Sequence, residues 1–143
     1  MGKSTTTCNN FLKLVFNATA WVNMADNAAS SPLTNLYVAL HTANPGAGGT
    51  QSTNEAAYTS YARVAVARTT GGWTASSAAS TSPVANIAFP TATGGSETET
   101  YWSIGVASSG ATTILYSGAI SPSITVTTGV LPQISTASTV TES

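Results

Sequence analysis

The stretch Thr98 to Val106 reads TETYWSIGV and decides the fold. In it Trp102 and Ile104 alternate with Tyr101 and Ser103, and a period of two is typical of a strand with one buried face. The pattern places Trp102 in the core and Tyr101 on the opposite face. Around this strand we therefore expect a sheet rather than a helical bundle.

Similar short runs lie on both sides of this stretch, and Gly and Pro turn signals separate them. The other strands are predicted at 36–40, 61–68, 84–89, 114–120, 124–128 and 133–140. Strands spaced about ten residues apart indicate an antiparallel β-sandwich or barrel. No repeat of fixed length is visible, which argues against a solenoid or a triple-helical fibre.

One amphipathic helix is predicted before the strands, over residues 9–26. Asn9 or Asn10 can cap its start by accepting hydrogen bonds from the first free amides. Its apolar positions recur at spacings of three and four. They are Phe11, Val15, Ala18, Trp21, Val22 and Ala25.

The length of 143 residues fits a single domain with one core. Its predicted parts are a flexible N-terminus at 1–8, the helix at 9–26 and a β-sandwich at 33–140. The sequence shows no apolar signal-peptide core and no apolar run of about 18 residues. We expect a protein made in the cytoplasm of a host cell, with no membrane partner.

Charge is scarce in this chain. Only 6% of the residues are charged and the formal net charge is −1, although 42% are hydrophobic. An ordinary soluble domain carries roughly 25% charged residues. Ser and Thr take the positions of the missing charges, so we expect much of the surface to be covered by partners. A secreted, Thr-rich monomer is the alternative interpretation.

The sheet edges give a second reason to expect partners. Soluble proteins protect exposed edge strands with charges, Pro or short strands. After Glu99 the only charged residue is Glu142, although several strands are predicted between them. Pro122 and Pro132 give some protection. We expect other subunits to cover these edges.

Composition argues against several function classes. Four basic residues, Lys3, Lys13, Arg63 and Arg68, cannot form the dense positive stripe that nucleic acid requires. One cysteine allows no internal disulfide, and one cysteine with one histidine cannot make a zinc site. We expect no cofactor.

An enzyme is also not expected. His41 is the one histidine and Asp26 the one aspartate, and no G-x-S-x-G elbow presents a nucleophile. Glu97 and Glu99 lie two apart on one strand, where they could form a weak calcium site with loop carbonyl oxygens. A solvated or interface-facing carboxylate pair is the alternative.

Four residues are interface candidates: Arg63, Arg68, Trp73 and Tyr101. The arginines stand out because charges are so rare, and aromatic residues are common both in cores and in interfaces. Arg63 has two alternatives, pairing with Glu55 or with a carboxylate of a neighbouring subunit. Trp73 fits the core and an interface equally.

Several stretches together resemble a known family. They are LYVALHTANPG at 36–46, Asn54-Glu55, YARVAV at 61–66, Trp73, Phe89-Pro90, Ser103-Ile104-Gly105 and LYSGA at 115–119. This set, which spans about residues 9 to 135, is similar to small virion proteins of tailed bacteriophages. Members are often labelled tail-fibre-like, and some resemble jelly-roll cement proteins of the head.

The resemblance implies a mainly β, jelly-roll-like antiparallel β-sandwich with one N-terminal α-helix, and no catalytic residues. It implies a head cement or decoration protein on the capsid surface of the virion, which would bind the major capsid protein and self-associate as a dimer or trimer. A short tail fibre, a tail adaptor or a receptor-binding tip is the alternative. A carbohydrate-binding sandwich is a further alternative.

Overall fold

The computed structural model describes residues 2–21 and 32–143. The chain is mainly β, with antiparallel sheets and one described helix, so the predicted fold class is confirmed. Its contacts group into two compact units. The helical unit comprises Met1–Asn35, Val66–Asn86 and Ser135–Ser143, and the sheet unit comprises Leu36–Ala65 and Ile87–Ile134. That the two fold as one domain stays a prediction.

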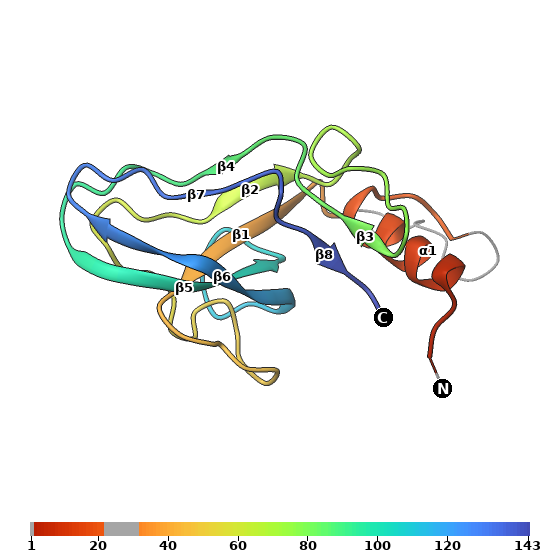
Figure 1. The fold of residues 1–143 in the computed structure, drawn as a ribbon, viewed down its shortest axis with the longest axis horizontal. Helices are drawn as coiled ribbons and strands as arrows, with labels where there is room; N and C mark the ends of the chain where they lie inside the picture. Colours follow the sequence, from red (N-terminus) through yellow and green to blue (C-terminus); the bar gives the residue numbers. More distant parts are fainter. Residues whose placement is uncertain (1, 22–31) are drawn as a thin grey trace. The chain divides into compact units, whose positions relative to one another are not determined.

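The main sheet has the strand order β2-β1-β5-β6 (Figure 1). These strands are β1 (Asn35–His41), β2 (Val64–Ala67), β5 (Ser96–Gly105) and β6 (Ile114–Thr127). β5 pairs antiparallel with β1 on one side and with β6 on the other. Trp102, in the middle of β5, lies opposite Leu40 and Gly118. β6 therefore forms one edge of the sheet.

The pairing of β5 with β6 is interrupted by an irregularity that lies in β6. Between the pairs Glu99–Ile124 and Tyr101–Ala119 the register advances by two residues in β5 and by five in β6, so the extra residues, which include Pro122, belong to β6. Trp102 and Ile104 are buried as predicted, but Glu99 and Ser103, which the alternation places on the opposite face, are buried too. Both faces of this part of β5 are therefore covered.

The sheet unit has a second, narrower pair of strands, β4 (Ile87–Ala88) and β7 (Gln133–Ile134). Their pairing continues in the following loops, where the amide of Phe89 donates to the carbonyl oxygen of Pro132 at 3.0 Å. The Phe89 ring stacks on Tyr61, with 6.2 Å between ring centroids. Side chains of this unit that are almost fully buried include Leu36, Val38, Leu40, Phe89, Ile104 and Val126.

The helical unit contains α1 (Thr5–Phe16), β3 (Ser80–Thr81) and β8 (Val140–Thr141), the two strands being paired. The Ser4 hydroxyl caps the helix by accepting a hydrogen bond from the Thr7 amide at 3.2 Å. Phe16 packs edge-on against Trp73, with 4.8 Å between ring centroids.

The predicted helix at 9–26 is wrong in its start, its end and its buried face. The helix starts at Thr5 because Ser4 supplies the cap, so part of the segment predicted to be flexible is helical. It ends at Phe16, and Ala18 has a left-handed φ of 50°. Its buried residues are Cys8, Leu12 and Phe16, whereas Phe11 is 42% exposed. Residues 22–26 of the prediction lie outside the described part of the chain.

The strand predictions are right in place but differ in extent. β6 is one strand through Pro122, where two strands were predicted. The segment predicted at 133–140 contains two separate strands, β7 and β8. The short β3 was not predicted. The described part of the chain contains no helix long and apolar enough to cross a membrane.

Candidate functional site

The four interface candidates lie in different surroundings. Trp73 is fully buried and Arg63 is 8% exposed, so each already has a place inside the fold of one chain. Arg68 and Tyr101 are half-buried. An interface role remains a prediction for all four. Arg63 and Trp73 make contacts within their own chain.

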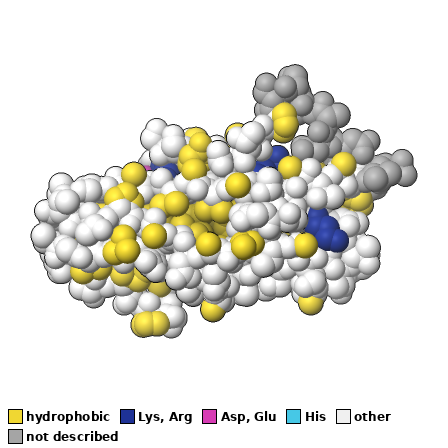
Figure 2. Space-filling view, turned by 90° about the horizontal axis from the view of Figure 1, so that it is seen from above, with side chains coloured by type: hydrophobic (Ala, Val, Ile, Leu, Met, Phe, Trp, Pro, Cys, Tyr) yellow, Lys and Arg dark blue, Asp and Glu magenta, His cyan; other side chains and the backbone are white. Residues whose placement is uncertain are grey.

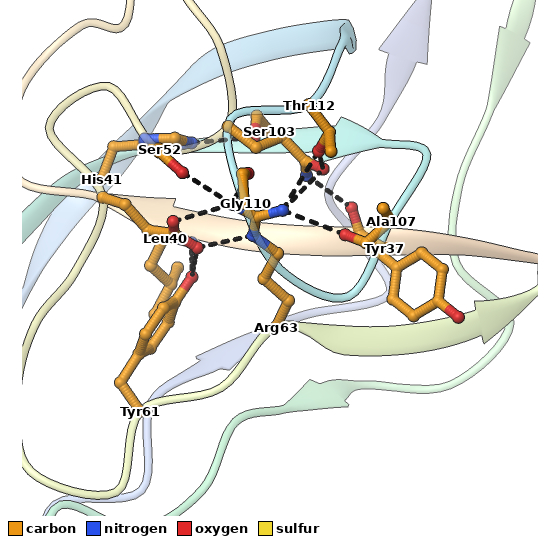
Figure 3. Close-up of polar contacts among 12 residues, drawn as sticks. Tyr37, Leu40, His41, Ser52, Tyr61, Arg63, Ser103, Ala107, Gly110 and Thr112 are labelled. Carbon is orange, nitrogen blue, oxygen red and sulfur yellow. Dashed lines mark hydrogen bonds and ion pairs between the residues drawn. The ribbon is translucent and has the colours of Figure 1, made fainter.

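Arg63 is the centre of a polar cluster in the sheet unit (Figure 3). Its Nε donates to Glu55 Oε1 at 2.6 Å, and its Nη2 donates to Glu55 Oε2 at 2.8 Å. This is the two-pronged arrangement in which an arginine binds a carboxylate most strongly. Of the two alternatives for Arg63, the structure has the pairing with Glu55 of the same chain.

The remaining donors of Arg63 bind a loop on the other side of the cluster. Nη2 donates to the carbonyl oxygen of Gly110 at 2.7 Å, and Nη1 donates to that of Ala107 at 3.0 Å. Nη1 also donates to the Thr112 hydroxyl at 3.1 Å. One guanidinium thus connects the loop before β6 with the segment that carries Glu55.

Gln51 packs into the same cluster and is fully buried. Its Nε2 donates to the Tyr37 carbonyl oxygen at 2.9 Å, and its Oε1 accepts from the Thr112 hydroxyl at 3.0 Å. A Cβ added at Gly105 would lie 2.2 Å from the Gln51 amide. Glycine at position 105 therefore makes room for the side chain that joins the two loops to the sheet.

Tyr61 and His41 extend the cluster. The Tyr61 hydroxyl donates to Glu55 at 3.1 Å and accepts from the Leu40 amide at 3.1 Å. Burial is the main cause that raises the pKa of Tyr61 far above its ordinary value. The hydroxyl therefore stays protonated and keeps its hydrogen bond to Glu55.

His41 is fully buried and uses both ring nitrogens. Nδ1 lies 2.9 Å from the carbonyl oxygen of Thr53, and Nε2 lies 2.8 Å from the Ser103 hydroxyl. Because a carbonyl only accepts, Nδ1 carries the proton and Nε2 accepts from Ser103. Burial, the largest cause, lowers the pKa of His41. The histidine is a neutral structural residue.

Glu97 and Glu99 lie on β5 in the same unit, before the register shift with β6. Glu97 Oε1 accepts from the amides of Ala57 at 2.8 Å and of Tyr58 at 2.7 Å. Glu99 is fully buried, and neither of its oxygens accepts a hydrogen bond from a described donor. Burial first, and then the neighbouring Glu97 carboxylate, raise the pKa of Glu99 to about 8.

A protonated Glu99 fits this environment. A buried carboxylate without hydrogen-bond donors is costly, so burial favours the neutral form of Glu99. Glu97 stays the acceptor for the two amides. No group of three or more His, Cys, Asp or Glu residues in the described ranges could hold a metal ion.

These contacts leave the sheet unit with no charged residue fully exposed. The unit, which is described throughout, contains four charged residues, and none of them is exposed. They are Glu55, Arg63, Glu97 and Glu99. The face in Figure 2 is accordingly mostly uncharged polar surface, interrupted by hydrophobic side chains and few charges.

The family-model comparison matches residues 2–142 to the family described as Podophage GP4 fiber I protein gp80. The match covers nearly the whole chain. The chain belongs to this phage fibre-protein family. The predicted resemblance to small tailed-phage virion proteins is thereby confirmed. A search of curated proteins found no match.

In this fibre-family protein the helical unit has its own arginine. Arg68 Nε donates to the carbonyl oxygen of Val15 at 2.6 Å, and Nη2 donates to that of Leu14 at 2.5 Å. Both carbonyls belong to the last turn of α1, where carbonyl groups lack helical partners. Arg68 thus fixes the end of the helix through backbone carbonyl oxygens.

Sequence reasoning missed two members of the cluster in the fibre-family chain, Gln51 and Tyr61. Gln51 stands in a Gly- and Thr-rich stretch that reads as a solvated loop. Tyr61 was assigned to a strand face, and the strand begins only at Val64. The one available signal was that Asn54-Glu55 and the YARVAV stretch occur together in the family resemblance.

Proposed function

We propose that this chain is a non-catalytic structural subunit on the outside of a tailed-phage particle, and that it is part of a tail fibre. The single observation that carries the proposal is the match of residues 2–142 to a phage fibre-protein family. The uncharged exterior of the sheet unit supports it, because such a surface can be buried against other subunits without removing charges from water.

The mechanism is attachment by surface contact. Nearly every charged group of the sheet unit is bound inside the chain, so the outer Ser and Thr side chains and the apolar groups between them make the contacts. A subunit that binds only the assembled particle stabilises it by mass action, and many weak contacts add up when copies are linked. The internal clusters keep the loops in the shape that those contacts need.

The second candidate is a head cement protein that bridges subunits of the major capsid protein, as a dimer or trimer on the capsid surface. One observation favours it. A fibre normally has a long shaft built from repeats, and the 143 residues contain no repeat of fixed length. In the fibre proposal this chain is therefore a compact module of a fibre and not its shaft.

Counting copies in separated heads and tails distinguishes the two locations. Particles are disrupted, heads and tails are purified apart, and this polypeptide is quantified in each by mass spectrometry against the major capsid protein. A few copies per tail and none on heads support the fibre proposal. Copies in large excess on heads support cement instead, and absence from both fractions contradicts a structural role.

A further inference from the structure

A turn in the helical unit places two alanines in a backbone conformation that alanine rarely adopts. Ala78 has a φ of 49° and Ala79 has a φ of 56°, and they are the two central residues between Ser77 and Ser80. The two serines exchange backbone hydrogen bonds of 3.1 and 2.9 Å, which closes a two-residue hairpin that leads into β3. Such hairpins need left-handed conformations at both central positions and favour Asn-Gly there. With Ala-Ala the turn is strained, so contacts from elsewhere must hold it.

Two segments far apart in the sequence hold this turn, and both bind Ala79. From α1, Asn9 Oδ1 accepts hydrogen bonds from the Ala79 amide at 2.7 Å and from the Ser76 hydroxyl at 3.1 Å. At the end of β8, the Glu142 amide donates to the Ala79 carbonyl oxygen at 3.0 Å. Lys3, just before α1, also forms an ion pair with Glu142. The turn is thus bound by the N-terminal helix and by the C-terminal strand at once.

The φ of Ala79 determines whether both contacts can be made together. This angle is the rotation about the bond between the amide nitrogen, which donates to Asn9, and the Cα atom, which leads to the carbonyl that accepts from Glu142. If Ala79 relaxes to the negative φ that alanine prefers, the amide and the carbonyl turn relative to each other by roughly 100° or more. One of the two hydrogen bonds must then break. Loss of either partner therefore permits a relaxation that withdraws Ala79 from the other partner.

We propose that the Ser77–Ser80 turn is a latch between the two ends of the described fold. Asn9 of α1 and Glu142 after β8 together hold Ala79 in its strained form, and release of either end loosens the other. The latch lies in the helical unit and goes beyond the proposed assembly role, which rests on the surface of the sheet unit. In an assembly, a subunit that displaces α1 thereby also frees the C-terminal strand.

Amide hydrogen exchange, measured by NMR on the full chain, tests the latch. In Asn9→Ala the acceptor for Ala79 is lost, and we expect the Glu142 amide to exchange about five- to tenfold faster. Asn10→Ala is the matched control, because it makes the same change at the next residue of α1, which is also half-buried. The control should leave the Glu142 rate within about twofold of the unaltered chain. Asn9→Asp keeps an acceptor oxygen and should restore slow exchange.

The reverse direction is tested from the C-terminal strand. Glu142→Pro removes the amide that binds Ala79, and we expect the Ala79 amide to exchange faster although its own partner, Asn9, is unaltered. Glu142→Gln is the control, because it removes the ion pair with Lys3 and keeps the amide. It should leave the exchange of Ala79 nearly unchanged.

A turn without strain separates a latch from an ordinary loss of packing. The double variant Ala78→Asn/Ala79→Gly adopts the left-handed conformations unaided, so adding Asn9→Ala to it should change the Glu142 rate by less than about twofold. An unchanged Glu142 rate in Asn9→Ala alone overturns the proposal, and so does an equal acceleration in the double variant. If circular dichroism shows that Asn9→Ala is unfolded, Glu142→Pro decides, and unchanged Ala79 exchange there overturns the proposal. None of these results depends on where the chain lies on the particle.

Discussion

The Arg63 cluster and the β6 edge belong to the same unit but differ in where their polar groups lie. The cluster buries charged groups, whereas β6 exposes uncharged ones. In the cluster Arg63 is 8% exposed, and its guanidinium donors bind a carboxylate, two hydroxyls, a side-chain amide and two backbone carbonyls. Along β6 there is no charge, and alternate side chains face solvent. A chain with few charges therefore uses them to fix its own loops and leaves its edge available for contact.

The difference leads to a general expectation about substitutions. Removing a charge from inside the sheet unit should lower stability and leave buried groups without partners. Adding a charge outside it should leave stability nearly unchanged and alter association.

The largest effect is expected for Arg63→Met. Loss of the guanidinium leaves the Glu55 carboxylate, whose side chain is 18% exposed, without its ion-pair partner. We expect the free energy of unfolding to fall by about 3–5 kcal/mol, as for other broken buried pairs. Urea denaturation measures this change.

Two further variants sharpen the result for Arg63. In Arg63→Met with Glu55→Gln no charge is left unpaired, so part of the lost stability should return. Arg68→Met removes donors to carbonyl oxygens only, and a loss of about 1–2 kcal/mol is expected. Equal losses for the two arginines would contradict a special role for the Arg63–Glu55 pair.

The second effect concerns Glu99 and pH. The pKa of Glu99 is raised from its ordinary value of 4.5 to about 8 in the folded chain. The folded state therefore binds more protons between these values, and stability falls as the pH rises from about 4.5 to about 8. Glu99→Gln, which keeps the neutral shape, should be more stable than the unaltered chain by roughly 2 kcal/mol at alkaline pH. Thermal unfolding from acid to alkaline pH measures the slope.

Glu142→Gln is the control for this slope, because Glu142 pairs with Lys3 in the helical unit. That variant should retain the full decline between about pH 4.5 and 8. If the decline also persists in Glu99→Gln, the protonated carboxyl pair is not its cause.

The third effect is the opposite slope of His41. Its pKa is lowered by burial, so the unfolded state takes up a proton first as the pH falls below about 6.5, and stability decreases. Glu99→Gln removes the competing slope, and in that variant we expect a loss of about 1 kcal/mol between about pH 6.5 and 5.5. Adding His41→Gln to this variant should remove the decline in stability between about pH 6.5 and 5.5. If the decline persists, a group other than His41 causes it.

The fold class could be predicted from the sequence because a fold class depends on many residues at once. Several strands alternate or are bounded by turn residues, and no single position decides the outcome. The burial of Glu99 could not be predicted. The alternation places Glu99 with Tyr101 and Ser103 on the face opposite Trp102, and it does not show that this face is covered as well.

The candidate site was only partly predictable, for a physical reason. Scarce charge indicated a surface covered by partners, but not that the remaining charges lie inside. That depends on contacts between residues far apart in sequence, such as Arg63 with Gly110. The helix was misplaced because Phe11 and Leu12 begin two equally regular apolar patterns, and packing favours the pattern through Leu12.

The smallest effect on stability is expected for Ser117→Lys. The side chain is exposed, and surface changes of this kind usually alter the free energy of unfolding by less than about 0.5 kcal/mol. Urea denaturation at a concentration where the chain is monomeric checks this. A large loss of stability would mean that Ser117 itself contributes to the fold. The effect of Ser117→Lys on association could then not be separated from its effect on folding.

The most direct measurement compares hydrogen exchange of β6 in intact phage particles with that in the dilute isolated chain. If partners cover the uncharged exterior, amides in Ile114–Thr127 exchange much more slowly in the particle, while the amides around the Arg63 cluster are protected in both samples. Equally fast exchange of β6 in particle and isolated chain would contradict the conclusion that this surface exists to be covered.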